Sequence, residues 1–396
     1  MLLLVINSGS SSIKFALMQM ADETVLLSGK VEAIGETQST VILRHHEKKQ
    51  QEESVQTTIA DHAEALEHAL VLLKQHIGNL HALGGIGHRV VHGGEYFQSA
   101  TLIDDQVINA IQKNIPLAPL HNPANLDGIK TMAKLCPELP QVAVFDTAFF
   151  QTLTPHAYRY AVPQAWYEDH HVRRYGFHGT SHQHVAKATA DYLNRSLDTL
   201  NLITLHLGNG SSAAAIKNGV CIDTSMGMTP LEGLVMGSRC GDIDPALPFY
   251  LVRNSEMDIH QIETMLNDNC GLKGLCGVQD MREIQRLAEN GDQQAQLAID
   301  LYCYRICKYI GAYHVALGRI DALVFTGGIG ENSQQIRQRV CAQLSVLGIE
   351  IDTQKNGSKM SGTVEISTAN SSVKVLVIPT NEELEIARQT AHIIQS

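Results

Sequence analysis

The sequence predicts an α/β protein with two similar halves, because its length and a repeated hairpin both indicate a duplication. The chain has 396 residues, which suggests two domains of ordinary size. The segment GSS occurs at residues 9–11 and again at 210–212, an offset of 201 (210 − 9), each time between two apolar segments and just after an asparagine. Two unrelated glycine-serine hairpins would also give this match. The shared strand–turn–strand context favours duplicated halves that each present a phosphate-handling hairpin to a common cleft.

The first half begins with a predicted β-hairpin. The apolar strand LLLVI is followed by the polar turn NSGSSS and by a second strand, IKFALM. Apolar residues then recur at helical spacing from Asp61, the expected N-cap, to Ile77. Strands are expected at 83–91 and 141–145, and the polar stretch 44–58 is the expected mobile surface segment.

The second half repeats the opening pattern near residue 202. The strand NLITLHL, the turn GNGSS and the strand AAAIK follow one another. Later, the strand at 322–325 runs into a glycine turn and the start of a helix. The strand VKVLVIP then precedes a last helix that ends near Ile394. The order of strands and helices is that of an α/β protein in both halves.

The composition predicts a globular protein and excludes several kinds of partner. Hydrophobic residues make up 44% and charged residues 18%, which is too apolar for a disordered chain. Lys and Arg number 30 and Asp and Glu 41, so the net charge is 30 − 41 = −11. That charge argues against nucleic-acid and anionic-membrane partners. A few cations in a cleft would still bind an anionic substrate.

The sequence further predicts a cytoplasmic protein. The apolar run 2–6 is too short for a signal peptide or a membrane span and has no basic residues before it. The eight cysteines form no C-x-x-C pair. Cys303 and Cys307 lie one helical turn apart, which leaves a structural zinc site open, but buried free thiols in a reducing compartment are the favoured interpretation.

Three glycine turns have the form of phosphate-binding segments. They lie at 7–12, 208–212 and 327–332, each after an apolar strand, and small residues there let backbone N–H groups approach phosphate oxygens. Lys14 lies on the strand that leaves the first turn. Neither a P-loop nor a complete G-x-G-x-x-G occurs, which excludes a P-loop protein and weakens a dinucleotide interpretation.

Phosphoryl transfer also needs cations and a carboxylate that holds magnesium. Arg89 lies in GHRVVHGG, and Arg239 lies in the polar turn GSRCGDID. Asp146 ends one apolar strand, and Glu382 follows another. Each alone fits a surface ion pair. Because all four lie at strand ends or in glycine turns, a shared functional site is favoured.

His178 lies in RRYGFHGTSHQH, between an aromatic residue and a glycine. With His182 and His184 it imitates a zinc site, although no Cys or Glu completes a recognisable ligand spacing. A rigid loop whose imidazole donates to an oxyanion is the functional interpretation. A structural histidine remains the alternative.

Taken together, these motifs resemble the acetokinase family of acetate and propionate kinases. The resemblance extends from the first strand nearly to the last helix. The matching segments are VINSGSSSIKF (5–15), GHRVVHGG (87–94), PLAPLHNP (116–123), VAVFDTAF (142–149), RRYGFHGTSH (173–182), HLGNGSS (206–212), DTSMGMTPLEGLVMGSRCGDIDP (223–245), FTGGIGEN (325–332) and IPTNEE (378–383).

The resemblance implies a duplicated actin-like α/β fold, shared with sugar kinases and actin, with two domains and a cleft between them. An N-terminal domain would span 1–150 and be completed by a C-terminal helix at about 384–396. The C-terminal domain, 151–383, would carry the nucleotide site and the interface of a homodimer.

The resemblance also implies a reversible transfer of the γ-phosphoryl group of ATP to acetate, with Mg²⁺ (or Mn²⁺) as the metal. Metal contacts would come from Asn7 and Glu382, and an ATP contact from Lys14. Arg89 would bind the acid, Asp146 would serve catalysis, and His178 and Arg239 would stabilise the transferring phosphoryl group. The implied nucleotide contacts are His206, Leu207, Gly208, Asn209, Gly210, Asp280, Met281, Arg282, Gly328, Ile329, Gly330, Glu331 and Asn332. The implied acyl pocket consists of Val91, Leu120, Phe177 and Pro230.

Two positions depart from the family pattern. Cys240 stands where serine is usual, and Phe150 stands where histidine is usual. Neither position has an assigned role. A thiol beside Arg239 raises the hypothesis that the protein is sensitive to oxidation.

A carboxylate acceptor is already ionised at neutral pH, so it needs no general base. We therefore expect Asp146 to orient an arginine or the waters of the metal rather than to remove a proton. A propionate or butyrate kinase remains an alternative, as does an actin-like ATPase switch. The switch would leave Arg89 and its flanking motif without a role, which favours the kinase.

Overall fold

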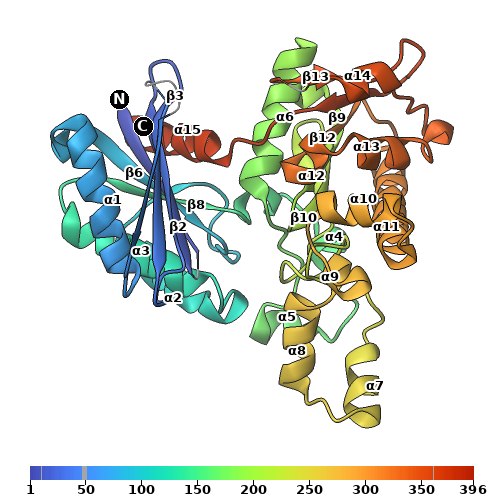
Figure 1. Ribbon diagram of the computed structural model, residues 1–396, viewed down its shortest axis with the longest axis horizontal. Coiled ribbons are helices and arrows are strands. Elements are labelled where there is room, and N and C mark those ends of the chain that lie inside the picture. The colour runs from blue at the N-terminus through green and yellow to red at the C-terminus, as the bar shows by residue number, and fades with distance from the viewer. Residues whose placement is uncertain (10, 47–50, 360) are drawn as a thin grey trace. The chain divides into compact units, whose positions relative to one another are not determined.

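The computed structural model describes residues 1–9, 11–46, 51–359 and 361–396, and it divides into two compact units (Figure 1). Unit 1 comprises Met1–Gln151 together with Asn381–Ser396. Unit 2 comprises Thr152–Thr380. The last helix of the chain therefore belongs to the unit that contains the first strand.

Unit 1 is built on an eight-stranded sheet with the order β5-β4-β3-β2-β1-β6-β8-β7. The strands β1, β6 and β8 are parallel to one another, whereas β1 to β5 form antiparallel pairs in sequence order. The strands are β1 (Leu2–Ser8), β2 (Ser12–Gln19), β3 (Thr24–Glu32), β4 (Ser39–His45), β5 (Gln51–Thr57), β6 (Leu83–Val90), β7 (Thr101–Leu102) and β8 (Gln141–Phe145).

Helices cover both faces of this sheet because alternate strand residues are apolar on both sides. On one face, Leu4 and Ile6 pack in a core with α1 and α3. On the other, Leu3 and Val5 pack in a core with α15. The helices of unit 1 are α1 (His62–Ile77), α2 (Asp105–Lys113), α3 (Asn122–Leu135) and α15 (Glu382–Gln395), with short 3₁₀ helices at Leu80–Ala82, Ile115–Leu117 and Ala148–Phe150.

The predicted first helix is confirmed together with its cap. The Asp61 side chain accepts a hydrogen bond from the Glu64 backbone N–H at 2.9 Å. The helix ends at Gly78, whose φ of 76° favours glycine.

Unit 2 is built on a six-stranded sheet with the order β11-β10-β9-β12-β14-β13. Helix α6 packs on β9 and β12, while α11 packs on β10 and β9 with the main core of the unit. The strands are β9 (Asn201–Leu207), β10 (Ser211–Lys217), β11 (Val220–Thr224), β12 (Ala322–Thr326), β13 (Val364–Glu365) and β14 (Lys374–Val377). The helices are α4 (Pro155–Tyr158), α5 (Gln164–His170), α6 (Gly179–Leu193), α7 (Leu247–Asn254), α8 (Ile259–Asp268), α9 (Gly271–Cys276), α10 (Met281–Glu289), α11 (Gln293–Leu317), α12 (Gly327–Asn332), α13 (Gln334–Cys341) and α14 (Thr353–Gly357), with 3₁₀ helices at Leu197–Thr199 and Ser345–Leu347.

The two sheets share one topology, which confirms the predicted duplication. In unit 1 the order β3-β2-β1-β6-β8 contains an antiparallel meander followed by two parallel strands. In unit 2 the order β11-β10-β9-β12-β14 repeats this arrangement.

The residue-by-residue match of the two hairpin turns was wrong. Ser8 pairs with Ile13, which leaves four residues between the paired positions. Leu207 pairs with Ser211, which leaves three, so the second serine pair lies on β10 rather than in the turn. Ser10, in the first GSS segment, lies outside the described residues.

The segment 44–58, predicted to be a mobile surface segment, is exposed but forms regular strand over most of its described length. Strands β4 and β5 pair in register from Ser39 with Thr57 to His45 with Gln51. A polar sequence can therefore form regular, paired strands and does not by itself indicate irregular structure. Residues 47–50 lie outside the described part of the chain.

Within the described residues, none of the helices has the length and apolarity that crossing a membrane requires.

Candidate functional site

The polar residues predicted in unit 1 gather at the carboxyl ends of its parallel strands. Asn7 lies near the end of β1, Arg89 lies near the end of β6, and Asp146 directly follows β8. The parallel register pairs Ile6 with His88 and Arg89 with Val144, which places these strand ends side by side. Their side chains contact one another, as the strand-end argument predicted.

Arg89 is the centre of this group. Its Nε donates to Asp146 Oδ1 at 3.0 Å, and its Nη2 donates to Asp146 Oδ2 at 2.5 Å. Its Nη1 donates to Asn7 Oδ1 at 3.2 Å. The bidentate pair fixes both the position and the plane of the guanidinium group.

Burial and neighbouring carboxylates act in opposite directions on Arg89. Burial lowers the pKa of its guanidinium, but Asp146 and Glu382 outweigh that effect, so the pKa is raised overall. Burial also raises the pKa of the Asp146 carboxyl, and Arg89 opposes that rise. The bidentate contact with the Arg89 guanidinium favours the ionised form of the Asp146 carboxyl against the effect of burial.

The oxygen donors at this end of unit 1 fit a magnesium ion. The Asn7 amide oxygen and the carboxylates of Asp146 and Glu382 are hard ligands, and Mg²⁺ is usually held by one or two carboxylates together with substrate phosphates. Glu382 is close enough to raise the pKa of both Arg89 and Asp146. In the described part of the chain, no group of three or more His, Cys, Asp or Glu side chains could hold a metal.

Lys14 lies directly opposite Asn7 in the β1–β2 pair, and its side chain is exposed. It lines a hollow of about 470 Å³ that also includes Asn381 and Glu383 from the start of α15. Unit 1 thus brings Lys14 to the same sheet face as the Arg89 group.

The loop after β6 is held by residues that the sequence analysis did not single out. Asn125 Oδ1 accepts from the Val91 N–H at 3.0 Å, and Asn122 Oδ1 accepts from the His92 N–H at 3.1 Å. Thr147 Oγ1 accepts from the Gly93 N–H at 3.0 Å. Both asparagines are buried in the first turns of α3. Asn122 lies in the matching segment 116–123, whereas Asn125 lies in none of the matching segments.

In unit 2, the three predicted nucleotide segments meet at one pocket of about 720 Å³. The turn after β9, the start of α10 and helix α12 contribute its walls. The lining residues are Gly208, Asn209, Gln279, Asp280, Met281, Arg282, Gln285, Gly328, Ile329, Asn332 and Ser333. The predicted contacts His206, Leu207, Gly210, Gly330 and Glu331 are not among them.

Glu331 has a structural contact instead. Its Oε1 accepts from the Gly327 N–H at 2.9 Å and from the Thr380 N–H at 3.0 Å. Gly327 has a φ of 77°, and a Cβ there would lie 2.8 Å from the Leu207 carbonyl oxygen. These contacts fix α12 against the end of β9.

His178 and Arg239 both lie close to Gly210. A Cβ at Gly210 would lie 3.3 Å from His178 Nε2 and 3.7 Å from Arg239 Nη1. Arg239 Nη1 also donates to the Pro230 carbonyl at 3.4 Å. Burial lowers the pKa of Arg239, with Asp268 acting weakly in the opposite direction. A largely buried cation and an imidazole therefore face one glycine turn beside the pocket.

The zinc alternative for the histidine cluster is not supported. Both ring nitrogens of His182 contact hydroxyl groups, Thr204 Oγ1 and Ser212 Oγ, each at 2.7 Å. Ser212 also contacts His178. His182 and Ser212 are therefore engaged with one another inside the unit rather than with a shared ligand position.

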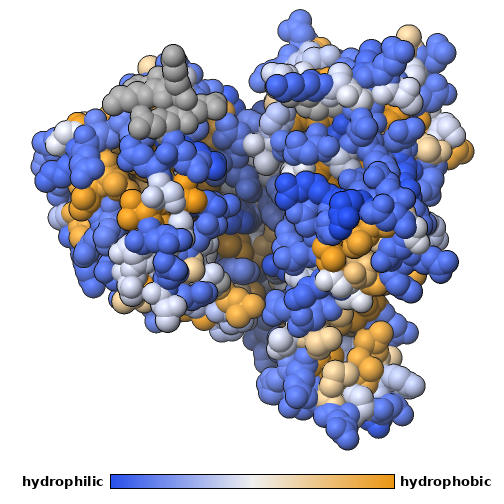
Figure 2. Space-filling model, in the orientation of Figure 1, coloured by the Kyte–Doolittle hydropathy of each residue, from blue (hydrophilic) through white to orange (hydrophobic). Residues whose placement is uncertain are grey.

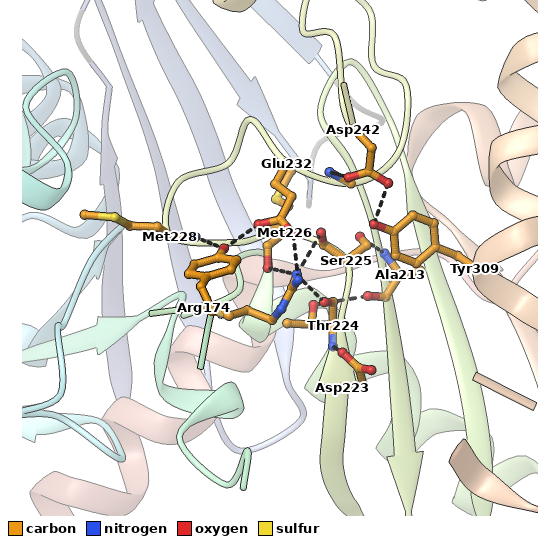
Figure 3. Close-up of polar contacts among 12 residues, drawn as sticks. Arg174, Ala213, Asp223, Thr224, Ser225, Met226, Met228, Glu232, Asp242 and Tyr309 are labelled. Atoms are coloured by element: carbon orange, nitrogen blue, oxygen red, sulfur yellow. Dashed lines mark hydrogen bonds and ion pairs between the residues drawn. The ribbon is translucent and has the colours of Figure 1, made fainter. Parts of the chain in front are cut away.

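The loop that carries Pro230 and Arg239 is anchored by a network that the sequence analysis missed (Figure 3). Arg174 Nη1 donates to the carbonyl oxygens of Thr224, Ser225 and Met226, and its Nη2 donates to Glu232 Oε1 at 2.6 Å. Asp242 accepts from the Gly233 N–H at 2.8 Å and from the Tyr309 hydroxyl at 2.9 Å. Tyr160 donates a short hydrogen bond to Glu232. These residues fix both ends of the loop.

The structure argues against the oxidation hypothesis for Cys240. Burial, with Cys270 adding to it, raises the pKa of the Cys240 thiol to about 11. The thiolate is the form that oxidants attack, so it is scarce at neutral pH. Phe150, the other departure from the family pattern, is fully buried in unit 1 beside Phe149.

The four predicted acyl-pocket residues are divided between the units. Val91 is 8% exposed and Leu120 is 67% exposed, and both lie in unit 1. Phe177 is buried in unit 2, where Pro230 lies in the loop described above. Neither unit contains the predicted pocket by itself.

A duplicated α/β fold in which glycine turns, an arginine and a histidine lie beside a large pocket is typical of a phosphotransferase of the kinase class. The acetokinase family model matches residues 2–388. The acetate kinase of Syntrophobacter fumaroxidans is 50% identical, covering 100% of this chain and 97% of its own. The crystal structure of Porphyromonas gingivalis acetate kinase matches at a TM-score of 0.95 with 43% identity over 99% of both chains. A propionate kinase from Francisella tularensis matches at 0.93 with 42% identity over 98% of both.

The chain belongs to the acetokinase family, and its duplicated α/β fold is that of these solved acetate and propionate kinases. It is an enzyme, a kinase.

Proposed function

We propose that the protein catalyses reversible, magnesium-dependent transfer of the γ-phosphoryl group of ATP to acetate, which gives acetyl phosphate and ADP. The observation that carries the proposal is that His178 and Arg239, a neutral or cationic donor and a guanidinium group, both lie close to Gly210 in the turn after β9. The curated relatives named acetate kinase over the full length of the chain support acetate as the acid.

The main barrier is electrostatic, because a carboxylate must approach a triphosphate. The acid is already ionised at neutral pH, so no group has to remove a proton. Arg89 would bind the carboxylate, and Arg239 with His178 would stabilise the charge on the equatorial phosphoryl oxygens in a direct in-line transfer. A magnesium ion held by Asn7 and Glu382 would neutralise phosphate charge.

Asp146 would act through Arg89. Its carboxylate contacts the guanidinium at two points and so fixes the orientation in which Arg89 meets the acid. In this role Asp146 orients a cation and does not act as a base. In unit 1, Lys14 would contact ATP. In unit 2, the 720 Å³ pocket would hold the nucleotide.

Propionate is the second candidate acid, because the Francisella propionate kinase matches almost as closely as the acetate kinase structure. Val91, buried after β6, would limit the length of the acyl group. One methylene changes transition-state binding by about 1–3 kcal/mol, so propionate should be a poor but measurable substrate.

The direct test is acyl-phosphate formation, trapped as a hydroxamate with hydroxylamine. Purified protein is incubated with magnesium-ATP and acetate, propionate or butyrate at equal concentrations. We expect the highest kcat/KM for acetate. ATP hydrolysis at full rate without any acyl phosphate would instead support an actin-like ATPase switch and reject the kinase proposal.

We also propose a cytoplasmic homodimer with its interface in unit 2. All eight cysteines lie within the described residues and are free thiols, as expected in a reducing compartment.

Apolar side chains gather over α7 and α8, at the lower right of Figure 2. Phe249 and Tyr250 are each 59% exposed, and Ile259 is 48% exposed. Light scattering should show a dimer that Phe249→Glu weakens, and a monomeric wild type would reject this part of the proposal.

A further inference from the structure

A chain of hydrogen bonds leads to His178 from the interior of unit 2. Thr204 Oγ1 lies 2.7 Å from His182 Nδ1, and His182 Nε2 lies 2.7 Å from Ser212 Oγ. Ser212 Oγ lies 2.9 Å from His178 Nδ1. Thr204, His182 and Ser212 are fully buried. The chain therefore reaches the imidazole of His178 at Nδ1.

The other nitrogen of His178 faces the reaction groups. Its Nε2 and Cε1 lie beside Gly210, on the side where Arg239 Nη1 also approaches. His206 stacks on the ring with centroids 4.3 Å apart and an interplanar angle of 24°. His206 Nδ1 in turn lies 2.7 Å from Ser181 Oγ. The stack and the Nδ1 contact together fix the plane of His178.

The single hydroxyl hydrogen of Ser212 determines how protons can be placed along this chain. Ser212 can donate to at most one of its two histidine contacts, so at least one histidine must donate to Ser212. If it donates to His178 Nδ1, then His182 Nε2–H donates to Ser212, and Thr204 donates to His182 Nδ1. A neutral His178 then carries its proton on Nε2, beside Arg239.

The reverse direction gives an unfavourable site. His178 Nδ1–H would donate to Ser212, and a neutral ring would present a bare Nε2 lone pair to phosphoryl oxygens. A lone pair facing an anion is repulsive, whereas an N–H beside the guanidinium of Arg239 adds a second donor.

We propose that Ser212 and His182 are positioning residues that hold the proton of neutral His178 on Nε2, so that this atom donates to the transferring phosphoryl group. The inference rests on the proposed phosphoryl transfer. It requires a neutral His182 with a single N–H. Burial, reinforced by the nearby His206, holds the pKa of His182 well below its ordinary value, which meets that requirement.

The tautomer of His178 can be measured without any activity assay. Protein labelled with ¹⁵N-histidine is examined by long-range ¹H–¹⁵N correlation spectra at neutral pH, and the His178 signals are assigned by their loss in His178→Gln. We expect a protonated Nε2 and an unprotonated Nδ1 in the wild type, and a mixture of tautomers in Ser212→Ala and Thr204→Val. A wild-type His178 with its proton on Nδ1 would overturn the proposal.

Kinetics supply the second readout. Loss of one hydrogen bond to His178 should lower kcat about tenfold in Ser212→Ala while the KM for ATP stays within about twofold. Thr204→Val is isosteric, and Thr204 lies two hydrogen bonds further from His178 than Ser212 does. We therefore expect kcat to fall about threefold in Thr204→Val. Ser212→Thr keeps the hydroxyl group and should recover most of kcat. If Ser212→Ala does not fold, Thr204→Val decides the question alone.

The matched control is Thr189→Val. Thr189 is also a fully buried threonine of unit 2, but its hydroxyl donates to the Val185 carbonyl within α6 at 2.7 Å. Its loss should leave the tautomer and kcat unchanged. Equal kinetic losses in Thr189→Val and Thr204→Val would reduce the chain to a packing role and overturn the proposal. Failure of the wild type to form acyl phosphate would reject the proposed function, whereas the tautomer decides the positioning role independently.

Discussion

Each unit contains one arginine that the proposed reaction uses, and the two arginines have opposite surroundings. Arg89 in unit 1 forms a bidentate pair with Asp146 and lies within reach of Glu382, and these carboxylates raise its pKa despite burial. Arg239 in unit 2 forms no ion pair with any residue that the structure describes, and burial lowers its pKa.

This difference indicates different roles for the two arginines, one positioned by a carboxylate and one available to bind an anion. A buried charge without a partner costs several kcal/mol, so it is retained where a ligand supplies the opposite charge. Arg239 fits that description. Arg89 is already paired with the carboxylate of Asp146. Asp146 therefore fixes the geometry of the Arg89 guanidinium and weakens the attraction of Arg89 for a second carboxylate.

The largest effect should follow loss of the arginine that lacks a carboxylate partner. We expect Arg239→Ala to lower kcat by about 10²–10³, equivalent to about 3–4 kcal/mol of transition-state stabilisation. The hydroxamate assay at saturating substrates measures it. Arg319→Ala, which removes an exposed arginine of the same unit, is the control and should not change kcat. An Arg239→Ala enzyme with more than a tenth of wild-type kcat would remove the distinction between the two arginines.

The pair in unit 1 should give mutants with opposite effects on the acid. Arg89→Ala should raise the KM for acetate and lower kcat, because it removes the carboxylate ligand. Asp146→Asn should lower kcat by about 10²-fold without raising that KM, because Arg89 keeps its charge and loses its counter-charge. Steady-state kinetics with varied acetate distinguish the two. If Asp146→Asn keeps most of its activity at saturating magnesium, the orienting role of Asp146 is wrong.

A smaller effect is expected at Val91, which the buried Asn125 holds after β6. Val91→Ala should increase the ratio of kcat/KM for propionate over acetate about tenfold, because the acyl group gains space. Competition between the two acids gives the ratio. Ala100→Gly, a small change at another buried position of unit 1, serves as the control. An unchanged ratio in Val91→Ala would place the acyl group elsewhere.

The smallest effect on catalysis is expected for substitution of His88, which lies next to Arg89 on β6. The same substitution should change the stability of the fold measurably. Burial lowers the pKa of His88 to about 4, with only partial opposition from its contact with Gln141. As pH falls from about 6.5 to 4, His88 therefore binds a proton in the unfolded chain before it does so in the folded one. The free energy of unfolding decreases by up to about 3 kcal/mol over this range. Urea unfolding should show a weaker pH dependence in His88→Gln. His81→Gln, an exposed histidine of the same unit, should behave like the wild type.

Much of the fold was predictable because its signals are local. The hairpins, the strand ends and the cap at Asp61 depend on neighbouring residues, and the structure has them where the sequence indicated. The match of the two GSS segments was wrong because three small residues do not determine which positions of two hairpins are equivalent. The segment at 44–58 was misjudged because a paired edge strand can be polar on both faces.

The supporting contacts of the site were not predictable in the same way. Arg174 and Glu232 lie 58 residues apart in the sequence, and Val91 and Asn125 lie 34 apart. Nothing in the local pattern around Asn125 or Glu232 indicates a partner, since each pair is formed only when separate elements pack. The same holds for the meeting of Ser212 with His182.

By itself, the sequence determined the duplicated α/β architecture, the acetokinase family and the residue types that a phosphoryl transfer needs, because strand ends and glycine turns are encoded by short segments. Only the tertiary structure decided which arginine is paired with a carboxylate, which nitrogen of His178 faces Gly210, and which side chains hold the loops. Those outcomes depend on distances between side chains far apart in the chain, and packing alone sets such distances.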